Sequence, residues 1–328
     1  MPLPTFEESI NMLPDGEVPS ILVANGFSRA WRNEIFNYEN LFDEADFRER
    51  DRQLRSIFNR FNTFDFEKVM LVLKSAQKVC EIYEVDNEIL QQITLDQEQL
   101  KESLIQVIAN THPRRPSEIT DQSFISTRRF IARFSNVFSL NYDMLLYWAV
   151  NKNNLAPAQP DSWCGKKDGF YQDEWQHRCQ NLHFLHGSLH LYNNAADVNK
   201  RVYNNEDWDA IVDQVRRWLD EGYFPLFVSE PTSNKKLEKI KHNPYLNACF
   251  EALKEQKGSF FIHGHSISES DMHIFDQINK SEISRVFISV YGDENSISNR
   301  ELIANARRFL IHNIEICFYD ATTTPIWL

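Results

Sequence analysis

The stretch that decides the fold runs from Asn136 to Trp148 and reads NVFSLNYDMLLYW. Its first half is an apolar, strand-like run, and its second half has the spacing of an amphipathic helix. Between them stands the polar step Asn141-Tyr142-Asp143. Ligands of open α/β folds lie just outside the carboxyl ends of strands, so an amide and a carboxylate at such an end can hold a sugar hydroxyl or position a water. The alternative is that Asp143 only caps the following helix.

Three other strand-like runs end in the same way, in small or polar residues. Pro19–Ala24 leads into Asn25-Gly26-Phe27-Ser28, Asn181–Leu185 into His186-Gly187-Ser188, and Ser259–His263 into Gly264-His265-Ser266. Gly26 allows a sharp turn and the close approach of a phosphate. Ser28 can cap a helix that we expect from Arg29 onward, whose first amides would favour an anion. The full glycine fingerprint of dinucleotide-binding loops is missing, so a plain turn also remains open here.

The alternation of strand-like and helix-like runs predicts the fold class. Further strands are expected at Pro225–Ser229, Arg285–Tyr291 and Ile314–Tyr319, with a return strand at Leu189–Tyr192. Strands separated by helices indicate a mostly parallel sheet that is covered on both faces. We therefore expect residues 1–328 to form a single α/β domain with a Rossmann-like sheet.

Two segments depart from this alternation. Glycine is absent between Phe27 and Asn136, and apolar residues recur there at helical spacing, so residues 40–135 are expected to form an inserted helical subdomain of three or four helices. One of these helices should span Asp86–Asn110 and end at the prolines that follow. Residues 151–180 are rich in Asn, Pro and Gly and are expected to form a long loop excursion.

Composition narrows the possible partners and cofactors. The formal net charge of −12 makes unaided binding along nucleic acid a poor prospect. No apolar run reaches the roughly 18 residues of a membrane span, and the first residues lack a signal sequence, so we expect a cytoplasmic protein. The five cysteines form no C-x-x-C pair, and His183, His186 and His190 match no usual zinc spacing, so no metal is expected.

The four strand ends together suggest a reaction. In a doubly wound sheet they lie along one edge and can line one crevice. Gly/Ser turns suit phosphate or ribose, Asn141 and Asp143 supply an amide and a carboxylate, and His186 supplies the usual base near neutral pH. This combination suits a nucleotide whose chemistry occurs at a sugar carbon.

At these motifs the chain resembles the sirtuin-like NAD-consuming proteins of bacterial anti-phage defence. The matching residues are Asn25-Gly26-Phe27-Ser28, Asn141-Tyr142-Asp143, His186-Gly187, and Gly264-His265-Ser266 with Asp271. The resemblance implies NAD⁺ as the bound substrate, with Asn141 and His186 as the catalytic residues. Asn141 would hold a water or the nicotinamide ribose, and His186 would be the general base. Cofactor contacts would come from Asn25, Gly26, Phe27, Ser28, Asp143, Gly187, Gly264, Ser266 and Asp271.

Within those contacts, the resemblance gives particular roles. Gly26 and Ser28 would contact the pyrophosphate, and Gly264 and Ser266 the adenosine ribose. Asp143 would bind the nicotinamide carboxamide or orient its neighbours. The implied activity is NAD⁺ glycohydrolysis to nicotinamide and ADP-ribose by an abortive-infection effector. A homo-oligomer and control by a ring ATPase or a phage-derived activator are also implied, whereas a preference for NAD⁺ over NADP⁺ is not.

Two alternatives belong to other classes of protein. Sirtuin deacylases share the motifs but add a four-cysteine zinc module and continue the first motif as Gly-Ile-Pro-Asp-Phe-Arg, and this chain has neither. A non-catalytic module that senses NAD⁺ or ADP-ribose would not need both Asn141 and His186. Hydrolysis is therefore the favoured prediction.

Overall fold

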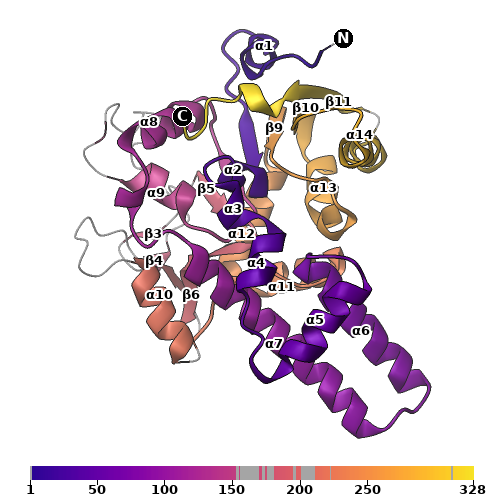
Figure 1. Ribbon diagram of the computed structural model, residues 1–328. Helices are drawn as coiled ribbons and strands as arrows, with labels where there is room; N and C mark the ends of the chain where they lie inside the picture. The colour runs from indigo at the N-terminus through magenta and orange to yellow at the C-terminus, as the bar shows by residue number, and fades with distance from the viewer. Residues whose placement is uncertain are drawn as a thin grey trace.

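The computed structural model describes residues 2–152, 155, 170–171, 174–175, 181–194, 197–200, 211–221, 223–311 and 313–328. A central sheet with helices around it forms the body of this part of the chain, and a helical hairpin projects from the body (Figure 1). Most of the predicted loop excursion at residues 151–180 lies outside the described residues. None of the described helices is both long enough and apolar enough to cross a membrane.

The central sheet has six strands, all parallel. They are β1 (Ser20–Val23), β2 (Val137–Ser139), β5 (Leu182–Phe184), β9 (Lys257–His263), β10 (Glu282–Val290) and β11 (Glu315–Asp320). Their spatial order is β11-β10-β9-β1-β2-β5. Counted along the chain this is the order 3-2-1-4-5-6, the order of dinucleotide-binding folds. The predicted Rossmann-like α/β fold is confirmed.

Both faces of the sheet are buried, because helices pack on each of them. Phe260 and Phe261 are neighbours on β9 and therefore point to opposite faces. Phe261 contacts Phe6 of α1 (Phe6–Asn11), and Phe260 contacts Phe138 of β2 on the other side. All of these rings are fully buried. Burial on both faces explains why the strands read as continuous apolar runs.

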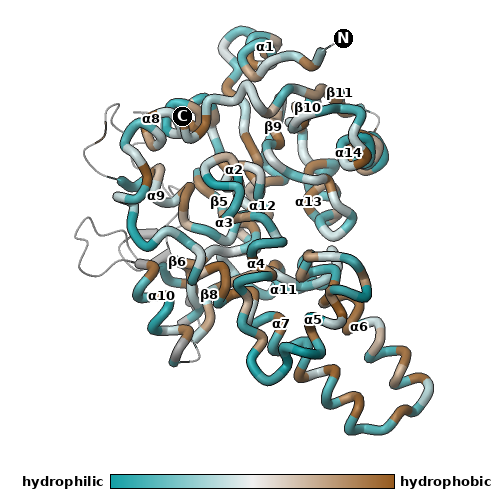
Figure 2. Tube along the Cα trace, viewed as in Figure 1, coloured by the Kyte–Doolittle hydropathy of each residue, from teal (hydrophilic) through white to brown (hydrophobic). Residues whose placement is uncertain are grey.

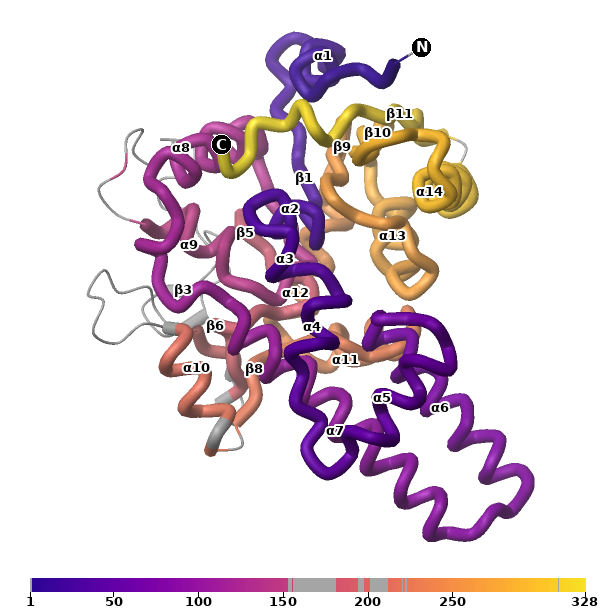
Figure 3. Tube along the Cα trace, in the orientation of Figure 1, coloured from indigo at the N-terminus to yellow at the C-terminus, as the bar shows by residue number. Residues whose placement is uncertain are grey.

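The segment between β1 and β2 contains helices only. These are α2 (Asn25–Arg29), α3 (Asn33–Phe36), α4 (Tyr38–Glu44), η1 (Arg48–Arg50), α5 (Asp51–Arg60), α6 (Phe66–Ile82), α7 (Asn87–Thr111), η2 (Pro116–Glu118) and α8 (Asp121–Ile131). Helices α6 and α7 form the projecting hairpin (Figures 1 and 3), which we call the arm. The side chains of Asp65 and Asp86 cap the two helices, and Gln97 bonds Gln77 across the hairpin at 2.8 Å. The base of the arm shares the core of the sheet domain, since Phe66 and Leu100 belong to the same buried cluster.

A second sheet contains β3 (Phe170–Tyr171), β4 (Glu174–Trp175), β6 (Gly187–Asn194), β7 (Asp197–Lys200) and β8 (Pro225–Phe227). Its strands pair antiparallel, in the order β3-β4-β7-β6-β8. The predicted return strand is thus part of β6. The predicted strand at Pro225–Ser229 is β8, but it pairs with β6 and does not join the parallel sheet.

The remaining helices follow these strands. They are α9 (Leu145–Asn151), α10 (Ile211–Asp220), α11 (Ser233–His242), α12 (Pro244–Lys254), η6 (Glu269–Asp271), α13 (Met272–Asn279), α14 (Ile297–Phe309) and η7 (Ala321–Thr323). The start of α11 lies beside the start of α6, and α13 follows β9 (Figure 3). The short helix η6 lies between β9 and α13 in the chain. This arrangement brings residues from α6, α11 and α13 to the carboxyl ends of the parallel strands.

Candidate functional site

The strand order reverses between β1 and β9, and the two turns that follow these strands touch through glycines. The Gly26 amide donates a hydrogen bond to the Gly264 carbonyl at 2.9 Å. A Cβ on Gly26 would stand 2.5 Å from the Cα of Gly264, and Gly264 has a φ of +72°. Both positions need glycine because the two backbones are in contact. The space that the sequence assigned to an approaching phosphate is therefore filled by the partner turn.

The turn after β1 differs from the prediction in a second respect. Helix α2 begins at Asn25, with Ala24 at its N-cap, so the predicted start at Arg29 and the predicted cap by Ser28 were wrong. Ser28 lies inside this short helix and is fully buried. Phe27 is also a core residue, since its ring packs against Trp327 with centroids 5.2 Å apart. The helix starts early because the Gly26–Gly264 contact turns the chain immediately after β1.

Asn141 stands at the centre of the first cluster of predicted residues. Its side-chain amide donates to the Ala24 carbonyl at 3.1 Å and to the Ser28 hydroxyl at 2.9 Å. The Ser28 hydroxyl in turn donates to the Asp143 carboxylate at 2.5 Å. Residues from the ends of β1 and β2 are thereby joined into one buried network, as the sequence predicted for the edge of the sheet.

Asp143 joins this network to the backbone at the start of α9. Its second carboxylate oxygen accepts a bond from the Leu145 amide at 2.9 Å, so both oxygens are engaged within the chain. Burial raises the pKa of Asp143 to about 6, against the lowering effect of the bonds from Ser28 and Leu145. The alternative that Asp143 is the N-cap of the following helix was wrong, because Met144 is the N-cap of α9 and makes no side-chain cap bond. A contact with a nicotinamide carboxamide stays a prediction.

His112 supports the same stretch and had no signal in the sequence. Its Nε2 accepts a hydrogen bond from the Met144 amide at 2.9 Å, which leaves Nδ1 to donate to the Pro113 carbonyl at 2.7 Å. Burial lowers the pKa of His112 to about 4. A neutral imidazole therefore fixes the backbone beside Asp143.

The second cluster surrounds His186, at the end of β5. Its Nε2 lies 3.1 Å from Nε2 of His273 and 3.9 Å from Oδ1 of Asp271. His265 receives the Ile267 amide on Nδ1 at 2.8 Å and directs Nε2 to the other Asp271 oxygen at 3.2 Å. Burial lowers the pKa of His186 well below its usual value, so the imidazole is neutral at pH 7. The sequence resemblance implied His186 as the base and Asp271 as a cofactor contact, and the fold places these two residues beside each other.

Lys236 and Glu67 complete this cluster, and neither was singled out in the sequence analysis. Lys236 on α11 is 1% exposed, and its ammonium donates to Asp271 at 2.9 Å and to Glu67 at 2.7 Å. Burial opposes ionisation of Asp271, but Lys236 holds the pKa of this carboxyl well below its usual range. Burial raises the pKa of Glu67 to about 7, although Lys236 opposes the shift. Glu67 belongs to the first turn of α6, so the arm reaches the cluster directly.

The other predicted contacts have different environments. Gly187 has a φ of +78°, and a Cβ there would lie 1.8 Å from the Leu226 carbonyl oxygen, so it is a packing glycine between β6 and β8. Ser266 is exposed, and the Asn25 amide bonds the Phe36 carbonyl at 3.1 Å. The histidines weighed as metal ligands do not converge, since His183 stacks on Phe138 and His190 stacks on Tyr147.

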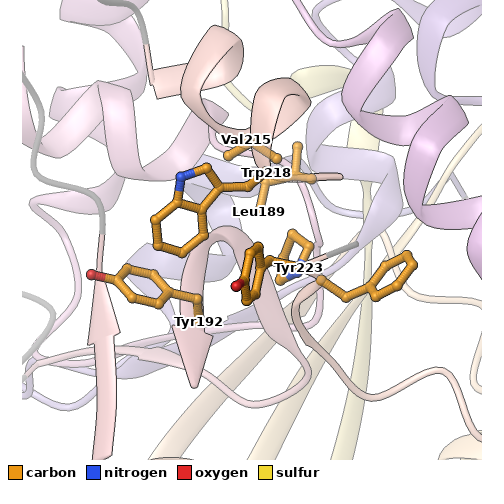
Figure 4. A pocket seen from close by; sticks show the side chains of 7 residues that line it. Leu189, Tyr192, Val215, Trp218 and Tyr223 are labelled. Carbon is orange, nitrogen blue, oxygen red and sulfur yellow. The ribbon is translucent and has the colours of Figure 1, made fainter. Parts of the chain in front are cut away.

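The candidate site is closed in this conformation. Asn141 is 8% exposed and His186 is 3% exposed. Two cavities of the described part of the chain lie elsewhere. One, between β6, β8 and α10, holds about 10 Å³ among aromatic rings that include Tyr192 and Trp218 (Figure 4), which is at most the room for one water. The other, of about 370 Å³, is lined by residues of α4, η1, α7 and α10 and their flanking turns.

Comparison with protein families gives one assignment. Residues 21–327 match the family described as a domain of unknown function (DUF4917). The chain belongs to the DUF4917 family. No curated protein matches the chain. The range matched by DUF4917 begins in β1 and includes every residue of the two clusters.

Proposed function

We propose that this chain is an NAD⁺ glycohydrolase, which cleaves the bond between nicotinamide and ribose. The observation that carries the proposal is the position of Asn141 and His186. They follow β2 and β5, which are neighbouring strands of a Rossmann sheet, and β2 in turn lies next to β1, where the strand order reverses. His186 is neutral there and stands beside the Asp271 carboxylate. A base next to a dinucleotide crevice is what hydrolysis at a ribose carbon requires.

The chemistry needs little from the protein beyond position and a base. The bond between C1′ and the pyridinium nitrogen breaks, and its electron pair neutralises the leaving nicotinamide. A water oxygen forms the new bond to C1′ and gives its proton to Nε2 of His186. Asp271 then stabilises the imidazolium, because its carboxylate opposes the effect of burial on the His186 pKa. Asn141 would direct the water or the ribose through its amide.

The closed conformation fits a latent state of such an enzyme. Nε2 of His186, which would accept the proton, is hydrogen-bonded to His273. The side-chain amide of Asn141 donates its hydrogen bonds to Ala24 and Ser28. Substrate entry therefore requires that these contacts separate. If a partner or ligand triggers the separation of these contacts, the protein is an effector that stays inactive until it is activated, as the resemblance to anti-phage proteins implies.

The arm offers a surface for such control. Val79, Ile82, Tyr83 and Ile89 at its tip are 49–78% exposed, and Figure 2 shows apolar stretches along it. Glu67 at its base reaches the His186 cluster through Lys236. We include in the proposal a cytoplasmic homo-oligomer formed through the arm tip. Activation by a ring ATPase or a phage-derived molecule rests on the resemblance alone.

A sensor that binds NAD⁺ or ADP-ribose without cleaving it is the second candidate. It is favoured by the hydrogen bonds that hold the Asn141 amide nitrogen and both Asp143 oxygens within the chain, because in this conformation none of these atoms is free to act on a substrate. Turnover separates the two candidates.

The test uses purified, tag-free protein with NAD⁺, and chromatography of nicotinamide and ADP-ribose. Release that is lost in Asn141→Ala and in His186→Ala supports hydrolysis at this site. The matched control is His242→Ala, an exposed histidine on α11, which should keep the rate of the native protein. NAD⁺ binding by calorimetry without any turnover, also in the presence of lysate from phage-infected cells, would favour the sensor.

A further inference from the structure

Three ligand atoms converge beside the strand ends in a way that the proposed hydrolysis does not use. Nε2 of His186, Nε2 of His273 and a carboxylate oxygen of Asp271 all lie within 4.8 Å of one another. The two imidazole nitrogens are 3.1 Å apart. Two nitrogens bound to one tetrahedral zinc ion at about 2.0–2.1 Å lie roughly 3.3 Å apart. The pair is therefore already close to the spacing that a shared ion would impose.

None of the three groups carries a positive charge at neutral pH. One of the two Nε2 atoms bears the proton of their shared hydrogen bond, and an entering ion would replace that proton, which the ring can carry on Nδ1 instead. Metal ligands must be unprotonated, and burial lowers the pKa of His273 to about 4 and that of His186 well below its usual value. Ser233 fixes the orientation of the His273 ring. The Ser233 hydroxyl lies 3.2 Å from Nδ1 of His273 and accepts a hydrogen bond from the backbone amide of His273 at 2.6 Å. A hydrogen-bonded far nitrogen is the usual support of a ligating imidazole.

The charge around these atoms favours a cation. Two carboxylates, Glu67 and Asp271, share the single ammonium of Lys236, and the histidines are neutral. Because the pKa of Glu67 is raised to about 7, this carboxyl is partly ionised at neutral pH and the cluster carries a fraction of a net negative charge, which a cation would compensate. Lys236 takes one lone pair of Asp271 Oδ1, and a carboxylate oxygen has a second one to give. Lys236 is also held by Glu67, so it need not leave when an ion enters.

We propose that His186, Asp271 and His273 form a binding site for a divalent transition-metal ion of the zinc type. Two imidazoles disfavour Mg²⁺ and Ca²⁺, which prefer oxygen ligands. Resting on the proposed function, we add that the bound ion inhibits hydrolysis, because it occupies the nitrogen of His186 that would accept the proton. This site shares only His186 with the three histidines weighed and rejected as metal ligands in the sequence analysis, since His183 and His190 lie elsewhere.

The test measures zinc binding and NAD⁺ cleavage separately. Metal-free, tag-free protein is titrated with zinc chloride by calorimetry, and cobalt chloride reports geometry through its visible absorption. The expected result is one zinc per chain, a tetrahedral cobalt spectrum, and affinity at least about tenfold weaker in His273→Gln and Asp271→Asn. His242→Ala should bind zinc like the native protein. Circular dichroism checks that each variant is folded.

Two results would overturn the site. One is a native protein that binds less than a stoichiometric amount of zinc. The other is binding that persists in His273→Gln and disappears when Cys164 and Cys179 are changed to serine, which would assign the ion to those cysteines.

The inhibition has its own readout. Zinc should stop nicotinamide release, and a chelator should restore it. If zinc binds as described and the protein never cleaves NAD⁺, the ion site stands and only the proposed function fails. If NAD⁺ is cleaved at the same rate with and without zinc, the inhibitory site fails and the proposed function stands.

Discussion

Acidification should destabilise this protein already above the pH range in which ordinary carboxylates titrate, because six histidines are buried in the neutral form. Burial lowers the pKa of each one, to about 3 for His183 and to about 4 for His112, His263 and His273, and well below the usual value for His186 and His190. In the unfolded chain each histidine takes up a proton near pH 6.5. Between pH 6.5 and 4 the unfolded state therefore binds more protons, so stability is complete above this window and is lost as the pH falls.

The size of the effect follows from these shifts. Between pH 7 and pH 5.5 each buried histidine removes about 1.2 kcal/mol from the free energy of unfolding, and six remove about 7 kcal/mol. Asp143 and Glu67 act in the opposite direction, since their raised pKa values of about 6 and about 7 mean that the folded state gains protons first. They return about 2 kcal/mol over the same range. The net loss of about 5 kcal/mol is comparable with the whole stability of many proteins.

His183 gives the sharpest single-site version of this prediction. It is 4% exposed, it stacks on Phe138 at 4.6 Å, and neither ring nitrogen has a hydrogen-bond partner within the described residues. His183→Phe should therefore fold, and its stability should fall by about 1 kcal/mol less than that of the native protein between pH 7 and 5.5. Urea unfolding at a series of pH values measures this, with exposed His242→Ala as the control. Stability that is flat over this range, or an unchanged slope in His183→Phe, would refute the reasoning.

Three further outcomes are expected. Gly264→Ala should lower the free energy of unfolding, measured in urea, by about 3 kcal/mol or more, because its Cβ would stand 2.6 Å from the Cα of Gly26. Gly292→Ala, which has a similar φ of +74° but open space around it, should lower it by only about 1 kcal/mol. Equal losses would contradict the close contact. Lys236→Met should lower the free energy of unfolding at pH 7 by about 3–5 kcal/mol, because it leaves two buried carboxylates without their cation. The exposed Lys235→Met should lower it by less than about 0.5 kcal/mol. A Lys236→Met variant as stable as the native protein would contradict the buried ion cluster. Ile82→Lys with Tyr83→Lys should reduce the mass measured by light scattering to that of one chain, and a native protein that is already monomeric would contradict assembly through the arm.

The sheet and its functional edge could be predicted because they depend on local pattern. Strands such as β1 and β9 are buried on both faces, so their sequences are unbroken apolar runs followed by glycine or polar turns. Once the strands are parallel, their carboxyl ends must share one edge, which is why Asn141, Ser28 and Asp143 meet as expected. The sequence pattern could not show that β8 pairs with β6, because the pairing of two strands depends on how the chain between them folds back.

The rest of the site depends on contacts between distant segments. Lys236 belongs to a lysine-rich helix that reads as a solvated surface, and only its packing against α6 and η6 buries it. Glu67 is an ordinary first-turn glutamate until α6 is placed beside α11. The Gly26–Gly264 contact joins two turns that are far apart in the sequence. The sequence could therefore indicate that a glycine is needed at position 26, but it could not show that the turn at Gly264 fills the space beside it.

The most direct test of the central claim is hydrolysis of NAD⁺ in water enriched in heavy oxygen, followed by mass spectrometry of the products. The proposed mechanism predicts unlabelled nicotinamide and ADP-ribose that carries one heavy oxygen atom, with both products absent in His186→Ala. NAD⁺ that remains intact with the native protein, alone and with lysate from phage-infected cells, would contradict the proposal. So would release of nicotinamide at the same rate in His186→Ala.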